Sequence, residues 1–593
     1  MINNISRKEY LLLIGVFIVF ILVHLPGLNL PYHQDEYKWP SIVLSNSSYI
    51  PHPPIGELIY KNLGKVFGAD NFRAIPFIFG ILNFFLLFYL VKSIFNNKTA
   101  LWSVFLFSIS FYSLLASFMV DTDGAIMPAF FLISSVGYYG LRKMNFQFSI
   151  FNFTIFLIGI IGGFLVKTSF IIAIAAFALD FAIERKVFSD RKKFFKHFAY
   201  LFGLGVILAL ILLLSKLIFP SFHLQSSLQY WEHFAKFGDR GWLQTFIQFA
   251  KSILYASPLL IIPAFFVNRE IFRKTRPFFL FVFLGLLFYF FAFDFSTGAL
   301  DRYFQFLIIP LCIISGAIFA KCINSSQVQV LKTLAQDDKP SREIFQQENI
   351  RGFSKFVPRK NLLLISGLTV IIFSLQFITH FVPPLYPKTE WISRILSLKW
   401  NFLFPFTGGS GPTGFYVSFL FTAIIWILSI IFSLGQKIQN SGFFLPKGFP
   451  QKSEPLHFLA PTLWIILILG ILYNGMLIEE HLFGKMNGSP YVLFAEAKKF
   501  ISENKEIKKV VVYNDIGGYE IQKIGKYERR LYAAPQFEST YKDFFKNFSG
   551  HILYIDIPKI GENNFYSNYL ATCKNIYEEK DNYITAKILE CKK

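Results

Sequence analysis

About thirteen apolar segments, most of them roughly 17 to 23 residues long, recur along the chain and constrain its fold more than any other feature. As an α-helix, a segment of this length crosses the hydrocarbon core of a bilayer. Only 16% of the residues are charged, whereas a soluble domain carries about a quarter. The sequence therefore predicts a polytopic α-helical membrane protein whose segments fall near residues 10–28, 73–91, 99–118, 124–141, 149–165, 169–183, 198–219, 252–267, 278–296, 303–320, 361–383, 413–434 and 457–478.

Lysine and arginine side chains gather in alternate loops, which predicts the orientation of the chain. No small-residue cleavage site follows the first segment, so we expect it to be retained as a helix. With a cytoplasmic N-terminus, the basic loops face the cytoplasm and account for the net charge of +21 without a nucleic-acid partner. These loops lie at residues 92–98, 142–143, 185–196, 269–276 and 321–360.

The same reading divides the chain into four parts. Residues 1–320 form a first transmembrane module, the polar segment 321–360 a cytoplasmic linker, and residues 361–480 further transmembrane helices. An odd number of crossings places residues 481–593 outside. Predicted strands near 508–513 and 552–557 alternate there with helices near 494–503 and 540–548, which is typical of a small α/β domain.

Two cysteines flank a predicted β-hairpin at the C-terminal end. The segment between Cys573 and Cys591 contains two strand-like runs around a turn at residues 579–582. A hairpin brings its ends close enough for a disulfide bond, which an oxidising compartment allows. The alternative is two unpaired thiols in a hairpin of a different register.

Two acidic clusters meet on the predicted outer face. Asp35 and Glu36 follow the first apolar segment, and Asp121 and Asp123 occupy a short turn between the third and fourth. Lys167 lies in the next outer turn, against the bias that keeps basic residues inside, and therefore requires an anionic partner. The alternative is that these acids are solvated loop residues.

A short helix is predicted at about residues 53–68, between the first two membrane segments. Pro53 and Pro54 suit its start, and Gly68 suits its end. It is too short to span a bilayer, and its apolar residues recur at near-helical spacing. We expect it to lie in the membrane interface, or else to pack on the protein as an outer-loop helix.

Taken in order with Arg302, Tyr303 and Pro310, these motifs resemble the GT-C class of membrane glycosyltransferases, in particular the protein O-mannosyltransferase and lipid A aminoarabinose transferase superfamily. The resemblance covers residues 1–320 by motif. It implies a GT-C fold and transfer of a sugar from a polyprenyl-phosphate-linked donor to a lipid, glycan or protein acceptor at the outer face. Membrane lipids surround such an enzyme.

The resemblance also implies roles for the acidic residues. Asp35 matches the first-loop catalytic acid of the family, with Glu36 as its usual neighbour. Asp123 matches the second acid, and Asp121 is an extra carboxylate that leaves the assignment between these two open. A divalent metal ion held by Asp35 and Asp123 is compatible with hard oxygen ligands, but no Cys/His cluster calls for one. No cofactor is otherwise predicted.

The basic residues suit contacts to the phosphate of the donor. Lys167 and Arg302, with Tyr303 beside it, match the donor-phosphate positions of the family, although Asp301 is an alternative partner for Arg302. Glycosyl transfer needs a base for the acceptor hydroxyl and positive charge for the departing phosphate, and these residues supply both. His52 and His233 are candidate substrate-binding residues in outer loops, with simple solvation as the alternative for His233.

Two other classes of protein fit a chain with many apolar segments. A lipid or glycan transporter usually places its charges near the bilayer centre and often shows an internal repeat, neither of which is apparent here. A non-catalytic subunit of an envelope assembly would tolerate substitution of the acids. Release of polyprenyl phosphate from a lipid-linked sugar separates these alternatives from the enzyme.

Overall fold

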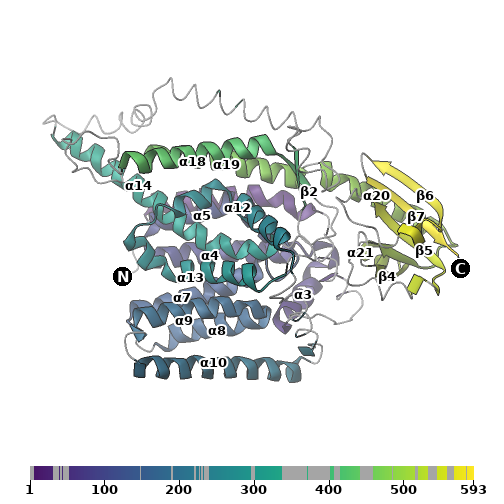
Figure 1. Cartoon of the computed structure of the whole chain (residues 1–593), viewed down its shortest axis with the longest axis horizontal. Coiled ribbons are helices and arrows are strands. Elements are labelled where there is room, and N and C mark those ends of the chain that lie inside the picture. The colour runs from purple at the N-terminus through teal and green to yellow at the C-terminus, as the bar shows by residue number, and fades with distance from the viewer. Residues whose placement is uncertain are drawn as a thin grey trace.

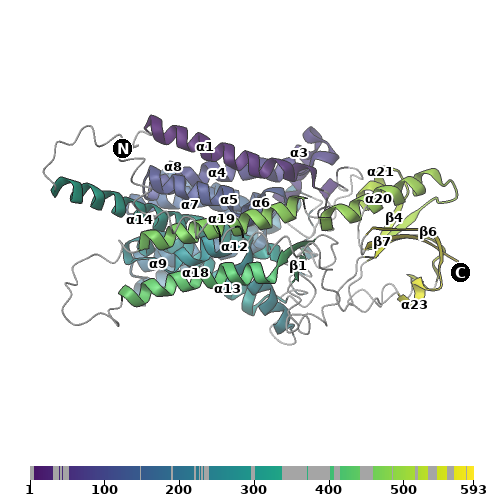
Figure 2. The same ribbon diagram turned by 90° about the horizontal axis from the view of Figure 1, so that it is seen from above.

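The computed structural model shows a bundle of long helices with a β-sheet at one end (Figure 1). It describes residues 6–336 and 401–592, with short gaps and longer ones at 44–52, 233–239, 295–300, 406–413, 441–458, 532–543 and 557–566; between 337 and 400 it describes Gly367 and Val370 only. The helices of the bundle run side by side, and the short helix α3 and the sheet lie at the same end of it (Figure 2).

Every predicted apolar segment except 361–383, which lies almost wholly outside the described residues, coincides with a helix. The segment predicted from residue 413 first forms strand β2 (Gly414–Ser418), which pairs with β1 (Asn401–Pro405). The bundle helices are α1 (Arg7–His24), α4 (Ala74–Ile94), α5 (Asn97–Ile109), α6 (Phe111–Phe118), α7 (Ile126–Lys143), α8 (Ile150–Val166), α9 (Ile171–Glu184), α10 (Arg191–Ile218), α12 (Trp242–Ala264), α13 (Arg269–Phe291), α14 (Ile308–Gln336), α18 (Phe419–Asn440) and α19 (Leu459–Phe483).

Five of the described helical segments are long and apolar enough to cross a membrane, and the pair α5–α6 makes six if its two parts count as one span. The axes of α5 and α6 differ by 69°. Several other helices, α8 among them, are apolar but shorter. The bundle is therefore consistent with an integral membrane protein, and the count of thirteen crossings stays a prediction.

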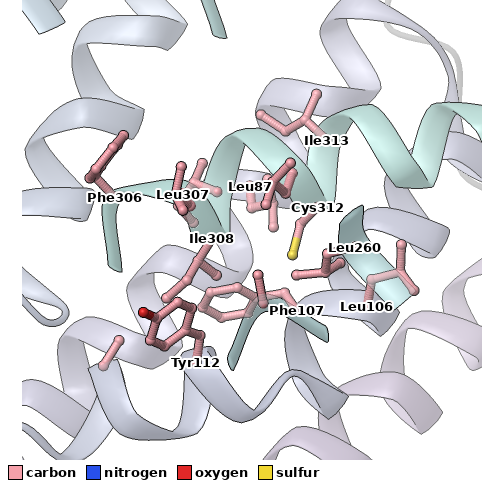
Figure 3. Packing of buried hydrophobic residues seen from close by; sticks show 14 of the residues in the cluster. Leu87, Leu106, Phe107, Tyr112, Leu260, Phe306, Leu307, Ile308, Cys312 and Ile313 are labelled. Carbon is pink, nitrogen blue, oxygen red and sulfur yellow. The ribbon is translucent and has the colours of Figure 1, made fainter. Parts of the chain in front are cut away.

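Buried hydrophobic side chains from both halves of the chain form one core in the bundle. Figure 3 shows part of it: Phe107 and Tyr112, on either side of the bend between α5 and α6, lie near Ile308 and Cys312 of α14 and Leu260 of α12. Phe107, Leu260 and Cys312 are almost completely inaccessible to solvent. The bend between α5 and α6 is thus inside the protein.

The predicted short helix is α3 (Pro54–Phe67), and it ends at Gly68, whose φ of 77° favours glycine. One face of α3, including Tyr60 and Gly64, is buried against the bundle. Leu58 and Val66 on another face are exposed. The packing of α3 on the protein is therefore confirmed for its buried face, and a place in the membrane interface stays a prediction for the exposed apolar side chains.

The C-terminal region contains a five-stranded sheet with the order β4-β3-β5-β7-β6. Strand β3 (Val510–Tyr513) is parallel to β4 (Tyr527–Leu531) and β5 (Gly550–Asp556), whereas β7 (Ile584–Cys591) is antiparallel to β5 and to β6 (Lys574–Asp581). Helix α20 (Lys485–Glu503) packs Phe494, Ala497 and Ile501 on this sheet. Two shorter helices, α21 (Gly518–Lys523) and α23 (Ser567–Leu570), belong to the same region.

The predicted hairpin is confirmed as β6 and β7, and the predicted disulfide bond is present. Cys573 and Cys591 are bonded, with their Cα atoms 4.4 Å apart. The alternative of two unpaired thiols is therefore wrong. Cys312 and Cys322 of α14, by contrast, are buried and are not part of this disulfide bond.

A buried ionic cluster lies at the C-terminal end of α7. Asp180 of α9 is fully buried, accepts a hydrogen bond of 2.6 Å from Tyr138 and pairs with Arg276 of α13. Arg276 and Arg142 also pair with Glu184. Since α7 begins beside the acidic turn and ends here, about 27 Å away at 1.5 Å per residue, this cluster clamps α7, α9 and α13 at the end predicted to be cytoplasmic.

Candidate active site

The acidic turn, residues 119–125, joins α6 to α7 and is buried throughout. Asp121 is 2% exposed and Asp123 is 3% exposed. At Gly124 a Cβ atom would lie 2.5 Å from the carbonyl oxygen of Ala116, so a glycine is needed for the turn to approach α6 this closely. The alternative of solvated loop acids is therefore wrong for Asp121 and Asp123.

Asp123 forms a buried ion pair with Lys167, which lies between α8 and the 3-10 turn η3 (Thr168–Phe170). The lysine side chain is 7% exposed, and its Nζ lies 4.5 Å from the centroid of the Tyr303 ring. Tyr303 belongs to the 3-10 helix η5 (Asp301–Leu307), which precedes α14. Three residues predicted from distant parts of the sequence thus meet at one point.

Asp121 has a different environment. Its Oδ1 accepts a 2.7 Å hydrogen bond from the backbone N–H of Thr122, and its backbone carbonyl accepts one of 3.0 Å from the hydroxyl of Tyr60 in α3. Burial raises the pKa of Tyr60 well above its ordinary value, so the hydroxyl stays protonated and donates. Asp121 therefore shapes the turn and joins it to α3, whereas Asp123 faces the lysine.

Glu36 lies beside the same turn and binds Arg73, which immediately precedes α4. The two nitrogens of Arg73 donate to Oε1 and Oε2 of Glu36 at 3.0 and 2.7 Å. Glu36 Oε1 also accepts from the backbone N–H of Val120 at 2.8 Å, and Arg73 donates to the carbonyls of Leu30, at 2.7 Å, and Phe118. This ion pair, 3% and 5% exposed, holds the first loop, α4 and the acidic turn together.

Sequence reasoning missed two residues that position the acidic turn. Arg73 carries the same sequence signal as Lys167, because it is a basic residue at a loop predicted to be outer, against the charge bias. Asn83 of α4 donates a 2.8 Å hydrogen bond to the carbonyl of Ala125, at the other end of the turn. An asparagine within an apolar segment is the signal that could have found it, since polar groups inside a membrane need partners.

The lining of an apolar pocket includes residues that are close in sequence to Lys167 and Tyr303. Its lining includes Ser169, two residues after Lys167, and Gln305, two residues after Tyr303. The hydroxyl of Ser169 and both polar atoms of the Gln305 side chain have no hydrogen-bond partner among the described residues. The rest of the lining is apolar or aromatic, and comprises Met127, Pro128, Phe131, Phe170, Ile172, Phe281, Tyr289, Phe306 and Ile309.

The structure does not describe the side chains of the other predicted site residues. Arg302 belongs to η5, directly before Tyr303, but its side chain is outside the described part. Asp35, His52 and His233 also lie outside the described residues. Among the residues that the structure does describe, no group of three or more His, Cys, Asp or Glu side chains could hold a metal ion. The described partner of Asp123 is the ammonium group of Lys167 rather than a second acid.

Comparison with known proteins adds a family match on the segment that carries this site. Residues 51–217 match the family model described as dolichyl-phosphate-mannose-protein mannosyltransferase. The matched segment includes α3, the acidic turn and Lys167, and amounts to less than a third of the chain. No curated protein matches the sequence significantly.

Among solved structures, the chain aligns with the archaeal oligosaccharyltransferase AglB from Archaeoglobus fulgidus. The complex with an inhibitory peptide and a dolichol-phosphate shows 14% identity and a TM-score of 0.27, covering 84% of this chain and 52% of that chain. The form tethered to an acceptor peptide with an NVT sequon shows 12% identity and a TM-score of 0.27, covering 91% and 57%. The chain thus spans little more than half the length of these proteins, and such low scores carry no further argument.

The family match falls on the segment that contains helix α3, the acidic turn and Lys167, and the structure brings these three together. The predicted resemblance to the GT-C class of membrane glycosyltransferases is therefore confirmed, through the dolichyl-phosphate-mannose-protein mannosyltransferase family on residues 51–217.

Proposed function

We propose that this protein is a membrane glycosyltransferase that moves a sugar from a polyprenyl-phosphate-linked donor to an acceptor hydroxyl at the outer membrane face. The observation that carries the proposal is the buried pair of Asp123 and Lys167 beneath Tyr303. A structural role alone gives such a pair little net stability, because desolvation of two charges offsets much of their attraction. Binding of the donor phosphate by Lys167 gives a functional reason for burying this pair of charges.

In the proposed reaction, the acceptor oxygen attacks the anomeric carbon of the donor sugar as the bond from that carbon to the phosphate oxygen breaks. The bonding electrons leave with the polyprenyl phosphate, and the proton of the acceptor hydroxyl passes to a carboxylate. Asp35 is the proposed base, and Asp123 the second acid of the site. A base in this position typically contributes 10²- to 10⁴-fold to the rate.

Lys167 and Arg302 are the proposed contacts to the donor phosphate. The negative charge on the phosphate increases as the sugar leaves, so a fixed ammonium group stabilises the transition state more than the ground state. Lys167 is already held by Asp123 and by the ring of Tyr303, and needs little reorganisation for this task. Donor binding then places the phosphate and Asp123 on either side of one cation.

The proposal includes the membrane topology expected from the sequence. With the N-terminus cytoplasmic, the acidic turn, α3 and the C-terminal sheet all face outward. Helix α3 and the sheet lie at one end of the bundle (Figure 2), and the acidic turn contacts α3 through Tyr60. An ion pair of 2.5 Å between Lys523 of α21 and Asp70, just after α3, joins the sheet to this end. The Cys573–Cys591 disulfide supports the outer location, since such bonds persist in oxidising compartments.

The experiment is a donor-turnover assay on the purified full-length protein. A polyprenyl-phosphate-linked sugar with a radiolabelled sugar is supplied with acceptor-containing membranes, and both transferred label and released polyprenyl phosphate are measured. Equal amounts of label and phosphate are expected. A transporter or a non-catalytic subunit would release no polyprenyl phosphate, and this outcome would reject the proposal.

Single substitutions distinguish the two acids of the turn. Asp123→Asn removes the partner of Lys167 and is expected to abolish turnover, whereas Asp121→Asn keeps an oxygen that can accept from the backbone of Thr122 and is expected to retain activity. Glu578→Gln is the control, because Glu578 is a largely exposed acid of strand β6 that pairs with Lys587 within the C-terminal sheet. If Asp121→Asn lost turnover and Asp123→Asn kept it, Asp121 would be the second acid of the site and Asp123 a structural residue.

A further inference from the structure

Two breaks in the helices of the bundle meet at a single asparagine. The first break separates α5 from α6 at Ser110, whose ψ of 129° is extended. The second lies within α12 at Ser257, whose φ of 66° and ψ of 160° form a strained backbone for a residue other than glycine, and Pro258 follows it. Strained or interrupted backbone inside a membrane bundle persists where neighbouring groups satisfy its polar atoms.

Asn474 of α19 contacts both breaks, through a backbone N–H at the first and through a side-chain hydroxyl at the second. Its Oδ1 accepts a 3.1 Å hydrogen bond from the backbone N–H of Phe111, the first residue of α6. Its Nδ2 donates to the hydroxyl of Ser257 at 3.0 Å and to the carbonyl of Gly470 at 2.9 Å. The N–H groups in the first turn of a helix have no partner within the helix, so the amide of Asn474 meets a need that the break creates.

Only the very short helix α6 separates the first break from the acidic turn. Helix α6 has only eight residues, all buried, and the acidic turn follows it directly. Tyr255, two residues before the second break, packs its ring 5.4 Å from Phe111 and 5.4 Å from Tyr112. The start of α6 is therefore held between Asn474 on one side and α12 on the other.

The second break lies in α12, the helix that packs against η5 next to Tyr303. Helix α12 also packs Phe249 against Phe304 of η5, with ring centroids 4.7 Å apart, and Phe304 is the neighbour of Tyr303. Figure 3 shows α12, α14 and the α5–α6 bend converging in the same core. One buried amide, 1% exposed, thus connects the segment that carries Asp123 with the helix that supports Tyr303.

We propose that Asn474 is a positioning residue of the active site, which fixes the start of α6 and thereby the place of Asp123 relative to Lys167. The inference rests on the proposed function only for its effect on turnover. Its effect on the acidic segment is structural and can be measured without a donor. The hydrogen bonds described for Asn474 reach Phe111, Ser257 and Gly470 rather than Asp123 or Lys167, so it acts through α6.

The test combines hydrogen exchange with kinetics on purified full-length protein. Asn474→Leu keeps the branching at Cγ but cannot accept from the N–H of Phe111, and exchange in residues 111–125 is expected to become about tenfold faster or more. Asn474→Asp keeps an acceptor oxygen and is expected to restore protection in part. The control is Ser315→Ala, which removes a buried 2.9 Å hydrogen bond from α14 to Leu260 of α12 without touching α6.

With a polyprenyl-phosphate-linked sugar as the donor, Asn474→Leu is expected to lower kcat while leaving KM close to the wild-type value. Ser315→Ala should leave both constants and exchange in residues 111–125 unchanged. Unchanged exchange in Asn474→Leu would overturn the proposal. So would faster exchange across the whole bundle, or a kcat no lower than that of Ser315→Ala. If the wild-type protein releases no polyprenyl phosphate, the proposed function fails, while the exchange result still decides the role of Asn474.

Discussion

Removing the charge of Lys167 tests whether the buried pair is held together by its own charges. In Lys167→Met the methionine fills much of the space of the lysine, but the carboxylate of Asp123, 3% exposed, loses its cation. Loss of one partner from a buried pair costs roughly 3 to 5 kcal/mol, because an uncompensated charge remains in the protein. The variant is therefore expected to unfold at a distinctly lower temperature.

The reverse change is expected to cost less. In Asp123→Asn the ammonium group of Lys167 keeps its contact with the ring of Tyr303 at 4.5 Å, and a contact of this kind is worth about 0.5 to 2 kcal/mol. Replacing both residues removes both charges, so the double variant is expected to lie within about 1 kcal/mol of the wild type. The cycle then gives a coupling energy of roughly 4 kcal/mol or more, far above the error of additivity.

The assay is thermal unfolding of the four purified proteins, followed by tryptophan fluorescence, together with donor turnover. All three variants should be inactive, although the double variant is as stable as the wild type. The matched control is Lys274→Met, which breaks an exposed pair with Glu270 and should cost less than about 1 kcal/mol. A double variant as unstable as Lys167→Met would refute the reasoning, since the two charges would then not be each other's main partners.

Three further predictions follow from the contacts around the site. Arg73→Met should destabilise the protein by roughly 3 to 5 kcal/mol because Glu36 stays buried without its partner, and the simultaneous change Glu36→Gln should recover much of that loss in thermal unfolding. Gly124→Ala should lower turnover and stability together, since its Cβ would lie 2.5 Å from a backbone oxygen; unchanged turnover would contradict the close packing of the turn. Cys591→Ser should lower stability by about 3 kcal/mol. A membrane-impermeant reagent should then label the freed Cys573, which is half-buried, in intact cells, whereas labelling only after lysis would place the sheet inside.

Much of the helical framework followed from the sequence, because apolar segments of membrane length have few alternatives to a helix. Helix α3 was predicted nearly to the residue, since Pro53 and Gly68 mark its ends by backbone geometry alone. The hairpin of β6 and β7 and its disulfide were also predicted, because strand and turn signals alternate over a short distance. These features all depend on local sequence.

The contacts within the site were harder to predict, because they depend on which distant segments meet. Asp123, Lys167 and Tyr303 were recognised as site residues, but their sequence positions say nothing of the pairing between them. The assignment of Glu36 to Arg73 depends on α4 lying beside the first loop, which no motif records. The role of Asn474 arises only where two broken helices meet.

The central claim is that outer-face carboxylates catalyse transfer from a lipid phosphate, and one measurement tests it most directly. The release of polyprenyl phosphate from a polyprenyl-phosphate-linked sugar is compared between the wild-type protein and Asp35→Asn at the same donor concentration. We predict turnover by the wild type and its loss in the variant, with thermal stability largely unchanged because an outer-loop acid contributes little to folding. Turnover by Asp35→Asn above a few per cent of wild type would contradict the account.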